Sequence, residues 1–208
     1  MAAVKAFIFD FGGVIVRTED PRPRHAWDER LGLPVGSVER AVHHSDIWIQ
    51  AQLGRITPSV YWKGVAELLY MRGEDIDDLR RDYFSGDRLN YRVVDLIRDL
   101  RTAGYPVALL SNESIELETR MAQYGVQDLF DHCFISAYMG MMKPDPTAFR
   151  VALQTLHVLP HEAVFIDDSL PNIRAAQALS INAVLFRADT DLRTELAKYL
   201  RDERDHTE

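Results

Sequence analysis

The sequence predicts an α/β fold: a Rossmann-like parallel sheet flanked by helices, with an α-helical segment inserted after the first strand. The apolar runs at residues 7–9, 107–110 and 164–166 are continuous rather than alternating, which is typical of strands buried on both faces. From Asn90 onward, helical and strand patterns alternate, which favours parallel strands joined by right-handed crossovers. Between about residues 17 and 88 we expect no strand, only amphipathic helices separated by proline and glycine.

These patterns divide the 208 residues into two parts. We expect residues 1–16 and 89–208 to form the α/β core, and residues 17–88 to form a helical cap. Such a chain is long enough to bury a sizeable core.

Local signals place three further elements. Thr57, an N-cap followed by a proline, opens a helix that should run to about Tyr70. Residues 181–186 are predicted to be the last strand, and residues 191–204 the terminal helix.

The composition excludes several classes of partner. The 24 basic and 32 acidic residues give a formal net charge of −8, which disfavours a general nucleic-acid or anionic-membrane surface. No segment approaches the roughly 20 apolar residues of a membrane span, and the start lacks a basic-then-apolar signal. Cys133 is the only cysteine, so no intrachain disulfide forms, and we expect a cytoplasmic protein in which Cys133 is a buried filler.

Polar side chains follow the predicted strands at their carboxyl ends. Asp10 follows the first strand, Ser111 and Asn112 the second, and the adjacent pair Asp167 and Asp168 a later one. In open α/β sheets this edge is where ligands bind. Taken alone, Asp10 is better explained as a helix cap or turn residue, and Ser111 could be the cap of a helix over residues 114–124.

Two further features suggest anion and cation chemistry. Lys143 lies in a proline-rich loop before a helix, where a lone lysine is ordinarily solvated. Asp167 and Asp168 repel each other, and a divalent cation would offset that repulsion. The alternative is that this pair caps the following helix; one carboxylate would suffice for that, so we favour the metal interpretation.

In this order, the four motifs resemble those of the haloacid dehalogenase superfamily, over essentially the whole chain. They are the sequences FDFGGV at residues 9–14, LSN at 110–112, MKPD at 142–145 and IDD at 166–168. The FDFGGV branch is similar to the phosphatase domain of soluble epoxide hydrolases and to bacterial sugar-1-phosphate phosphatases. The resemblance implies a Mg²⁺-dependent phosphatase that hydrolyses a small phosphorylated metabolite through an aspartyl phosphate, under a helical C1 cap. It implies no nucleic-acid or membrane partner and sets no oligomeric state.

The resemblance also implies how the residues share the work. Asp10 is the expected nucleophile, with Ser111 and Lys143 as the other catalytic residues. The expected Mg²⁺ ligands are Asp10, the main-chain carbonyl of Gly12, Asp168, and Asp167 directly or through water. Residues expected to bind the substrate and its phosphate oxygens are Phe11, Gly12, Ser111, Asn112 and Lys143.

Gly12 departs from the pattern of this superfamily's phosphatases. They carry a second Asp at that position, two residues after the nucleophile, as general acid and base. A general acid or base contributes on the order of 10²–10⁴-fold, so its absence predicts a slow enzyme, or one suited to good leaving groups, or one that recruits another acid. The candidates for that acid are Glu19, Asp20, Glu113, His43 and His44.

Two alternatives follow from the same departure. Dehalogenation needs a nucleophilic Asp but no metal, and dehalogenases replace the acidic pair that Asp167 and Asp168 retain here. A non-catalytic phosphate-ligand binder or regulatory protein is the alternative from another class, although the retained motifs weaken it. The aromatic residues of the inserted segment are enough to line a pocket, but at helical spacing they are more typical of a core.

Overall fold

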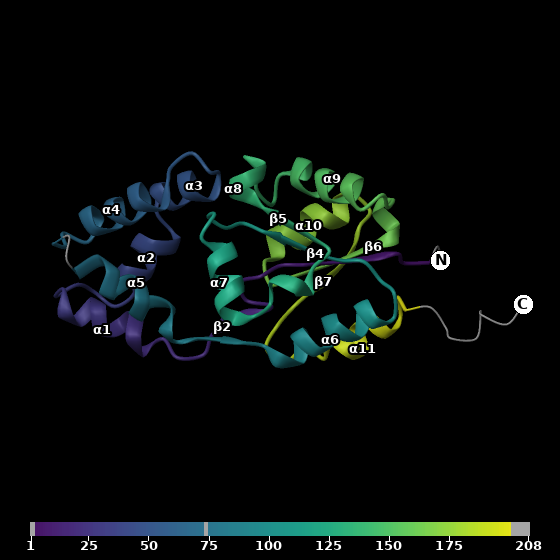
Figure 1. Cartoon of the computed structure of the whole chain (residues 1–208), viewed down its shortest axis with the longest axis horizontal. Coiled ribbons are helices and arrows are strands. Elements are labelled where there is room, and N and C mark those ends of the chain that lie inside the picture. The colour runs from purple at the N-terminus through teal and green to yellow at the C-terminus, as the bar shows by residue number, and fades with distance from the viewer. Residues whose placement is uncertain (1–2, 73–74, 201–208) are drawn as a thin grey trace, which may run out of the picture.

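The computed structural model describes residues 3–72 and 75–200, and in these a parallel five-stranded sheet forms the centre of the α/β part (Figure 1). Every pair of neighbouring strands in this sheet is parallel. In spatial order the strands are β5 (His132–Ile135), β4 (Val107–Ser111), β1 (Ala6–Phe9), β6 (Ala163–Asp167) and β7 (Asn182–Leu185). The predicted fold class is confirmed.

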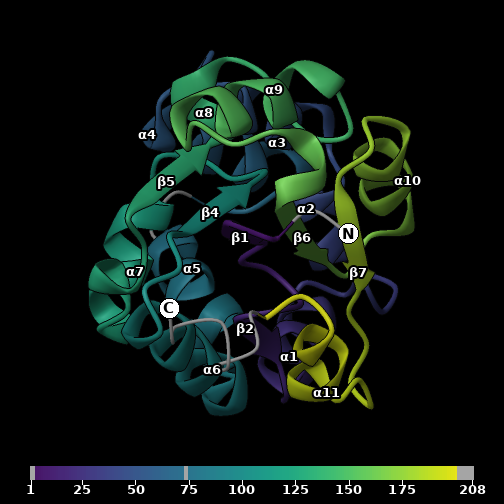
Figure 2. The same cartoon turned by 90° about the vertical axis from the view of Figure 1, so that its right-hand side faces the viewer.

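Helices cover both faces of the sheet, as the view along it shows (Figure 2). Side chains alternate between the faces: Phe7 and Phe9 pack with α6 (Tyr91–Thr102), α7 (Leu117–Tyr124) and α11 (Leu192–Ala197). Ile8 packs on the other face with α9 (Pro146–Thr155) and α10 (Leu170–Ala178). This two-sided burial is the reason that the strand sequences are continuously apolar.

In the described residues between the first strand and α6, five α-helices lie at the left of Figure 1. They share a hydrophobic cluster of their own that includes Trp27, Trp48, Tyr61 and Tyr83. They are α1 (Arg22–Arg30), α2 (Ser37–His43), α3 (Asp46–Gln52), α4 (Pro58–Leu68) and α5 (Ile76–Ser85). The Thr57 hydroxyl accepts the N–H of Val60 and begins α4 as predicted. The domain bounds at residues 16/17 and 88/89 remain a prediction.

The expectation of no strand between residues 17 and 88 is wrong at both ends of that segment. The strand β2 (Val16–Thr18) pairs antiparallel with β3 (Asp87–Leu89). The two segments that connect the helices α1 to α5 with the α/β part therefore form one two-stranded sheet. Strands of three residues give too short an alternation to be detected from sequence.

The expectation for Cys133 is also wrong, because this residue is exposed. It lies on β5, the edge strand, where the first two residues are exposed and only the last two are buried. The helix predicted over residues 191–204 is shorter, since α11 spans Leu192–Ala197, and residues 201–204 lie outside the described residues. The remaining described elements are the short helix α8 (Ser136–Met139) and the 3₁₀ helices η2 (Gln127–Leu129) and η3 (Pro160–Glu162).

Candidate active site

Three strand ends bring the first, second and fourth motifs together. Asp10 follows β1, Ser111 ends β4 and Asp167 ends β6, and these strands are neighbours with Phe9 paired to Leu109 on one side and to Ile166 on the other. The N–H of Asp10 extends the ladder by donating to the Ile166 carbonyl at 2.9 Å. All three residues are buried, as expected for the carboxyl edge of a doubly wound sheet.

Lys143 reaches the same point from the loop between α8 and α9 and is not solvated. Its side chain is 1% exposed, and its Nζ lies 2.9 Å from Asp10 Oδ1 and 2.7 Å from Asp167 Oδ2. Burial alone would lower the pKa of Lys143, but the charges of Asp10 and Asp167 outweigh it and raise that pKa. Lys143 therefore stays an ammonium ion between two carboxylates.

Asn112 holds the loop that carries this lysine. Its Nδ2 donates to the Lys143 carbonyl at 2.6 Å, and its Oδ1 accepts the Lys143 N–H at 2.8 Å. Gln52, from α3, donates to the Asn112 carbonyl at 2.7 Å. The sequence predicted Asn112 as a residue that binds the substrate, so these side-chain bonds add a positioning role to that prediction.

One ammonium ion faces three carboxylates at this edge. Oxygen atoms of Asp10, Asp167 and Asp168 all lie within 4.8 Å of one another. Burial raises the pKa of Asp10, which the charge of Lys143 opposes and the charge of Asp167 reinforces. Burial and then the charge of Asp167 likewise raise the pKa of Asp168. A divalent cation would relieve this crowding, and oxygen ligands are those that Mg²⁺ prefers, so the residues fit the expected metal.

The two members of the acidic pair differ in their surroundings. Asp167 is fully buried, and besides Lys143 it accepts the N–H of Ser169 at 2.7 Å and the Asn172 amide at 3.0 and 3.2 Å. Asp168 is partly exposed and lines a cavity. Asp168 and Asp10 thus have more capacity left for a metal than Asp167, whose oxygens are already engaged.

The residues after Asp10 form a tight turn that leads into β2. The N–H of Phe11 donates to Asp10 Oδ1 at 2.7 Å, and the N–H of Gly13 donates to the Val16 carbonyl at 2.8 Å. Phe11 and Gly12 line the same cavity as Asp168. Ser111 is buried at the end of β4, 2% exposed.

That cavity, of about 540 Å³, is called here the catalytic cavity; of the predicted site residues, Phe11, Gly12 and Asp168 line it. Three of the predicted substitute acids line it with Gly12, namely His43, His44 and Glu113. Glu19 and Asp20 do not: they pair with Arg17 and Arg22. Glu113 forms an ion pair with Arg120 at 2.5 Å, so its carboxylate is already engaged by a protein partner.

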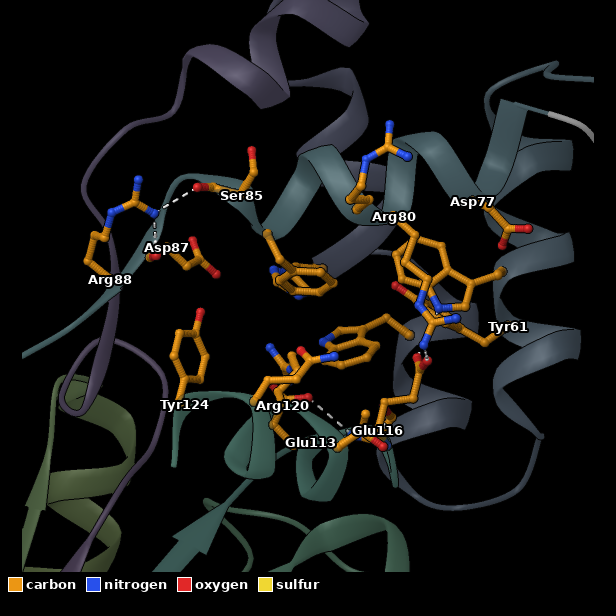
Figure 3. A pocket seen from close by; sticks show the side chains of 18 residues that line it. Tyr61, Asp77, Arg80, Ser85, Asp87, Arg88, Glu113, Glu116, Arg120 and Tyr124 are labelled. Atoms are coloured by element: carbon orange, nitrogen blue, oxygen red, sulfur yellow. Dashed lines mark hydrogen bonds and ion pairs between the residues drawn. The ribbon is translucent and has the colours of Figure 1, made fainter. Parts of the chain in front are cut away.

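A second, larger cavity of about 710 Å³ adjoins the first and is called here the cap pocket (Figure 3). Its lining residues come from α2 to α5 on one side and from α7 and the loop before it on the other. They include the aromatic residues Trp48, Tyr61, Trp62 and Phe84.

The comparisons with known proteins agree with this geometry. A model of the haloacid dehalogenase-like hydrolases matches residues 4–179. The chain belongs to this family. The resemblance predicted from the four motifs is thereby confirmed, as is the expectation of a hydrolase.

Relatives within the haloacid dehalogenase-like family include named phosphatases. The chain is 28% identical over 179 residues to a sesquiterpene phosphatase of Aspergillus oryzae, covering 85% of this chain and 87% of that protein. It is 27% identical over 207 residues to a D-ribitol-5-phosphate phosphatase of Bacteroides thetaiotaomicron, covering 95% and 98%.

A solved structure of a family member shares the fold. It is a HAD family enzyme from Bacteroides thetaiotaomicron in complex with magnesium and inorganic phosphate, with a TM-score of 0.78 and 25% identity, covering 93% of this chain and 99% of that one. In the described part of our chain, no helix is long and apolar enough to cross a membrane.

Sequence reasoning missed three residues that the structure places beside the site. Asn172 holds Asp167, Gln52 links α3 to Asn112, and Arg120 neutralises Glu113. Asn172 had a signal, since it lies at the start of the helix after the acidic pair. Gln52 lies far in sequence from every motif, and Arg120 follows the LSN motif by eight residues without a pattern that marks it, so the tertiary structure identifies both.

Proposed function

We propose that this haloacid dehalogenase-like hydrolase is a Mg²⁺-dependent phosphatase of a small phosphorylated metabolite, with Asp10 as nucleophile. The observation that carries the proposal is the juxtaposition of Asp10, Lys143 and the acidic pair at one buried sheet edge beside a cavity. The names of the two phosphatase relatives, and magnesium with phosphate in a solved family member, support the same reaction class.

In the proposed reaction, an Asp10 carboxylate oxygen attacks the phosphorus of a monoester. The new bond joins Asp10 to the phosphoryl group, while the ester P–O bond breaks and its electron pair leaves on the alcohol oxygen, which takes up a proton. Water then attacks the phosphorus, the Asp10–phosphoryl bond breaks, and inorganic phosphate and free Asp10 result.

Each neighbouring residue has a part in these steps. Lys143 orients Asp10 and supplies positive charge to the phosphoryl oxygens, and Asn112 fixes Lys143. Ser111 and the Asn112 N–H are the proposed phosphate donors. Mg²⁺, held by Asp10, the Gly12 carbonyl and Asp168, with Asp167 directly or through water, supplies charge neutralisation when bound.

Gly12 provides no proton donor, so we propose that good leaving groups react fastest. Retention of Asp167 and Asp168 argues against dehalogenation, and a cytoplasmic location remains a prediction.

The test is turnover of p-nitrophenyl phosphate with and without Mg²⁺. We expect activity that chelation abolishes and that Asp10→Asn removes, because an amide is a poor nucleophile. Asp191→Asn is a matched control, since Asp191 caps α11 outside the catalytic cavity. Wild-type turnover by Asp10→Asn would refute the mechanism, and phosphate binding without turnover of any ester would favour the non-catalytic binder.

A further inference from the structure

The cap pocket and the catalytic cavity are neighbours that share part of their walls. Four residues line both: His43, Asp87, Glu113 and Arg120. The Arg120–Glu113 ion pair is thus a common wall, beyond which the cap pocket extends away from Asp10. A group attached to a phosphate in the catalytic cavity has this pocket next to it.

The charged residues around the cap pocket are largely satisfied by protein partners. Arg80 pairs with Glu116, and Arg120 pairs with Glu113 (Figure 3). Arg88 donates to the carbonyls of Ser85 and Asp87 at 2.7 and 2.8 Å. Asp87 in turn pairs with Arg24 at 2.9 Å. Few of these groups are therefore free to recognise the hydroxyls of a sugar, because each would first have to leave its partner.

Two of the aromatic residues have their polar atoms engaged as well. Trp62 Nε1 donates to Glu116 Oε2 at 2.9 Å, and the Tyr61 hydroxyl donates to the Val42 carbonyl at 2.6 Å. The rings of Trp62 and Phe84 stand edge to face with centroids 6.4 Å apart. What these residues offer to a ligand is apolar ring surface.

The size of the cap pocket fits a larger group than a short sugar chain. Its volume of about 710 Å³ lies within the range of about 300–1,000 Å³ for pockets that bury a drug-sized ligand. Pockets of this kind are lined mainly by apolar and aromatic side chains, with few polar groups that set orientation. The lining of the cap pocket also includes charged and polar residues, so an extended apolar group matches the volume of the pocket and its aromatic part.

We propose that the cap pocket is a binding subsite for the apolar part of the substrate, so that among phosphate monoesters of alcohols those with long apolar groups bind more tightly than those of polyols. The proposal rests on the proposed phosphatase function. The phosphate lies in the catalytic cavity, and the apolar chain passes the Arg120–Glu113 pair into the space beside Trp62 and Phe84.

The test uses n-alkyl phosphonates of increasing length, which cannot be hydrolysed, titrated calorimetrically into the protein with saturating Mg²⁺. Burying a methylene is worth about 0.8 kcal/mol, so Kd should fall by up to about fourfold per carbon until the pocket is full. Polyol phosphonates of equal length should bind more weakly. A Kd that does not change with chain length, or tighter binding of the polyol phosphonates, would overturn the proposal.

A variant pair on α7 locates the effect. Thr119 is exposed and lines the cap pocket, so Thr119→Trp fills part of it and should end the gain in affinity at a shorter chain. Ala122→Trp adds the same residue to the same helix at an exposed position outside the lining, and should keep the wild-type slope. If Thr119→Trp also keeps that slope, the chain binds elsewhere.

Failure of the proposed function gives a different result. If p-nitrophenyl phosphate is not hydrolysed but affinity still rises with chain length, the apolar subsite stands and the reaction does not. If the ester is hydrolysed but chain length has no effect, the phosphatase stands and the subsite is refuted.

Discussion

Asp168 occupies the space in which a side chain at position 13 would begin. A Cβ on Gly13 would lie 2.0 Å from Asp168 Oδ2, and the backbone of Gly13 has a φ of +74°. Only glycine meets both conditions without strain. Gly13, the second glycine of the FDFGGV motif, therefore leaves the space in which the Asp168 carboxylate approaches Asp10.

Gly13→Ala should therefore displace Asp168 and weaken Mg²⁺ binding. We expect a loss of at least about tenfold in affinity, the lower end for changes to groups that orient metal ligands. Gly12→Ala is the matched control, because a Cβ there meets nothing within 4 Å. Calorimetric titration with Mg²⁺ checks both, and equal affinity in Gly13→Ala and Gly12→Ala would contradict the steric argument.

Asn112→Ala should lower activity by releasing the loop that carries Lys143. The change removes two hydrogen bonds and leaves the Lys143 backbone groups without them, which costs about 1–3 kcal/mol of stability. Because Lys143 then loses its fixed position against Asp10, kcat should fall. The free energy of unfolding should fall as well. Urea unfolding and steady-state kinetics on p-nitrophenyl phosphate measure the two effects.

Asn182 offers the comparison for that variant. Its amide also donates two bonds to backbone carbonyls, those of His161 and Ala163 at 2.9 and 3.1 Å, at the start of β7. Asn182→Ala should lose stability and keep kcat. A similar loss of kcat in both variants would show that Asn112 acts only through stability.

The motifs and the sheet were predictable from sequence because each depends on local pattern. Buried strands are continuously apolar, and Asp10, Ser111 and Asp167 follow directly from where those strands end. Cys133 was misplaced because its apolar neighbours do not reveal that β5 is an edge strand. Glu113 and Arg120 are close in sequence, but their place between the two cavities was not predictable, since it depends on how the cap helices lie against α7.

His43 should make stability depend on pH. Burial and the charges of Arg120 and Arg24 lower its pKa from 6.5 to about 3 in the folded protein, so the unfolded chain binds the extra proton. The stability that the folded protein gains from a neutral His43 is then fully present above pH ~6.5 and is lost as the pH falls toward ~3.

The measurement is urea unfolding of wild type and His43→Gln at about pH 7.5 and about pH 5. The free energy of unfolding of wild type should fall by up to about 2 kcal/mol more than that of the variant over this interval. This figure follows because about 1.5 pH units of the interval lie below the pKa of His43 in the unfolded chain. Glutamine retains an acceptor for the Tyr83 hydroxyl, which lies 3.0 Å from His43 Nδ1. The same pH dependence in both proteins would show that His43 takes up its proton while folded.

The absence of a side chain at Gly12 should make the rate depend steeply on leaving-group pKa. An alkoxide leaves poorly without an acid, whereas p-nitrophenolate departs nearly unaided. Gly12 faces the catalytic cavity, and a Cβ there meets no atom within 4 Å, so Gly12→Asp has room for a carboxyl group. We expect that variant to raise turnover of simple alkyl phosphates by up to about 10²-fold, with little gain on p-nitrophenyl phosphate.

Gly12→Asn is the control, since asparagine has the same size as aspartate and no acidic proton. Phosphate monoesters graded by leaving-group pKa, assayed on all three proteins, give the slopes. If wild type hydrolyses poor and good leaving groups equally fast, an acid already serves the site. His43, His44 and Glu113 are the residues of the predicted set that line the cavity, but the lowered pKa of His43 leaves it without a proton to donate near neutral pH.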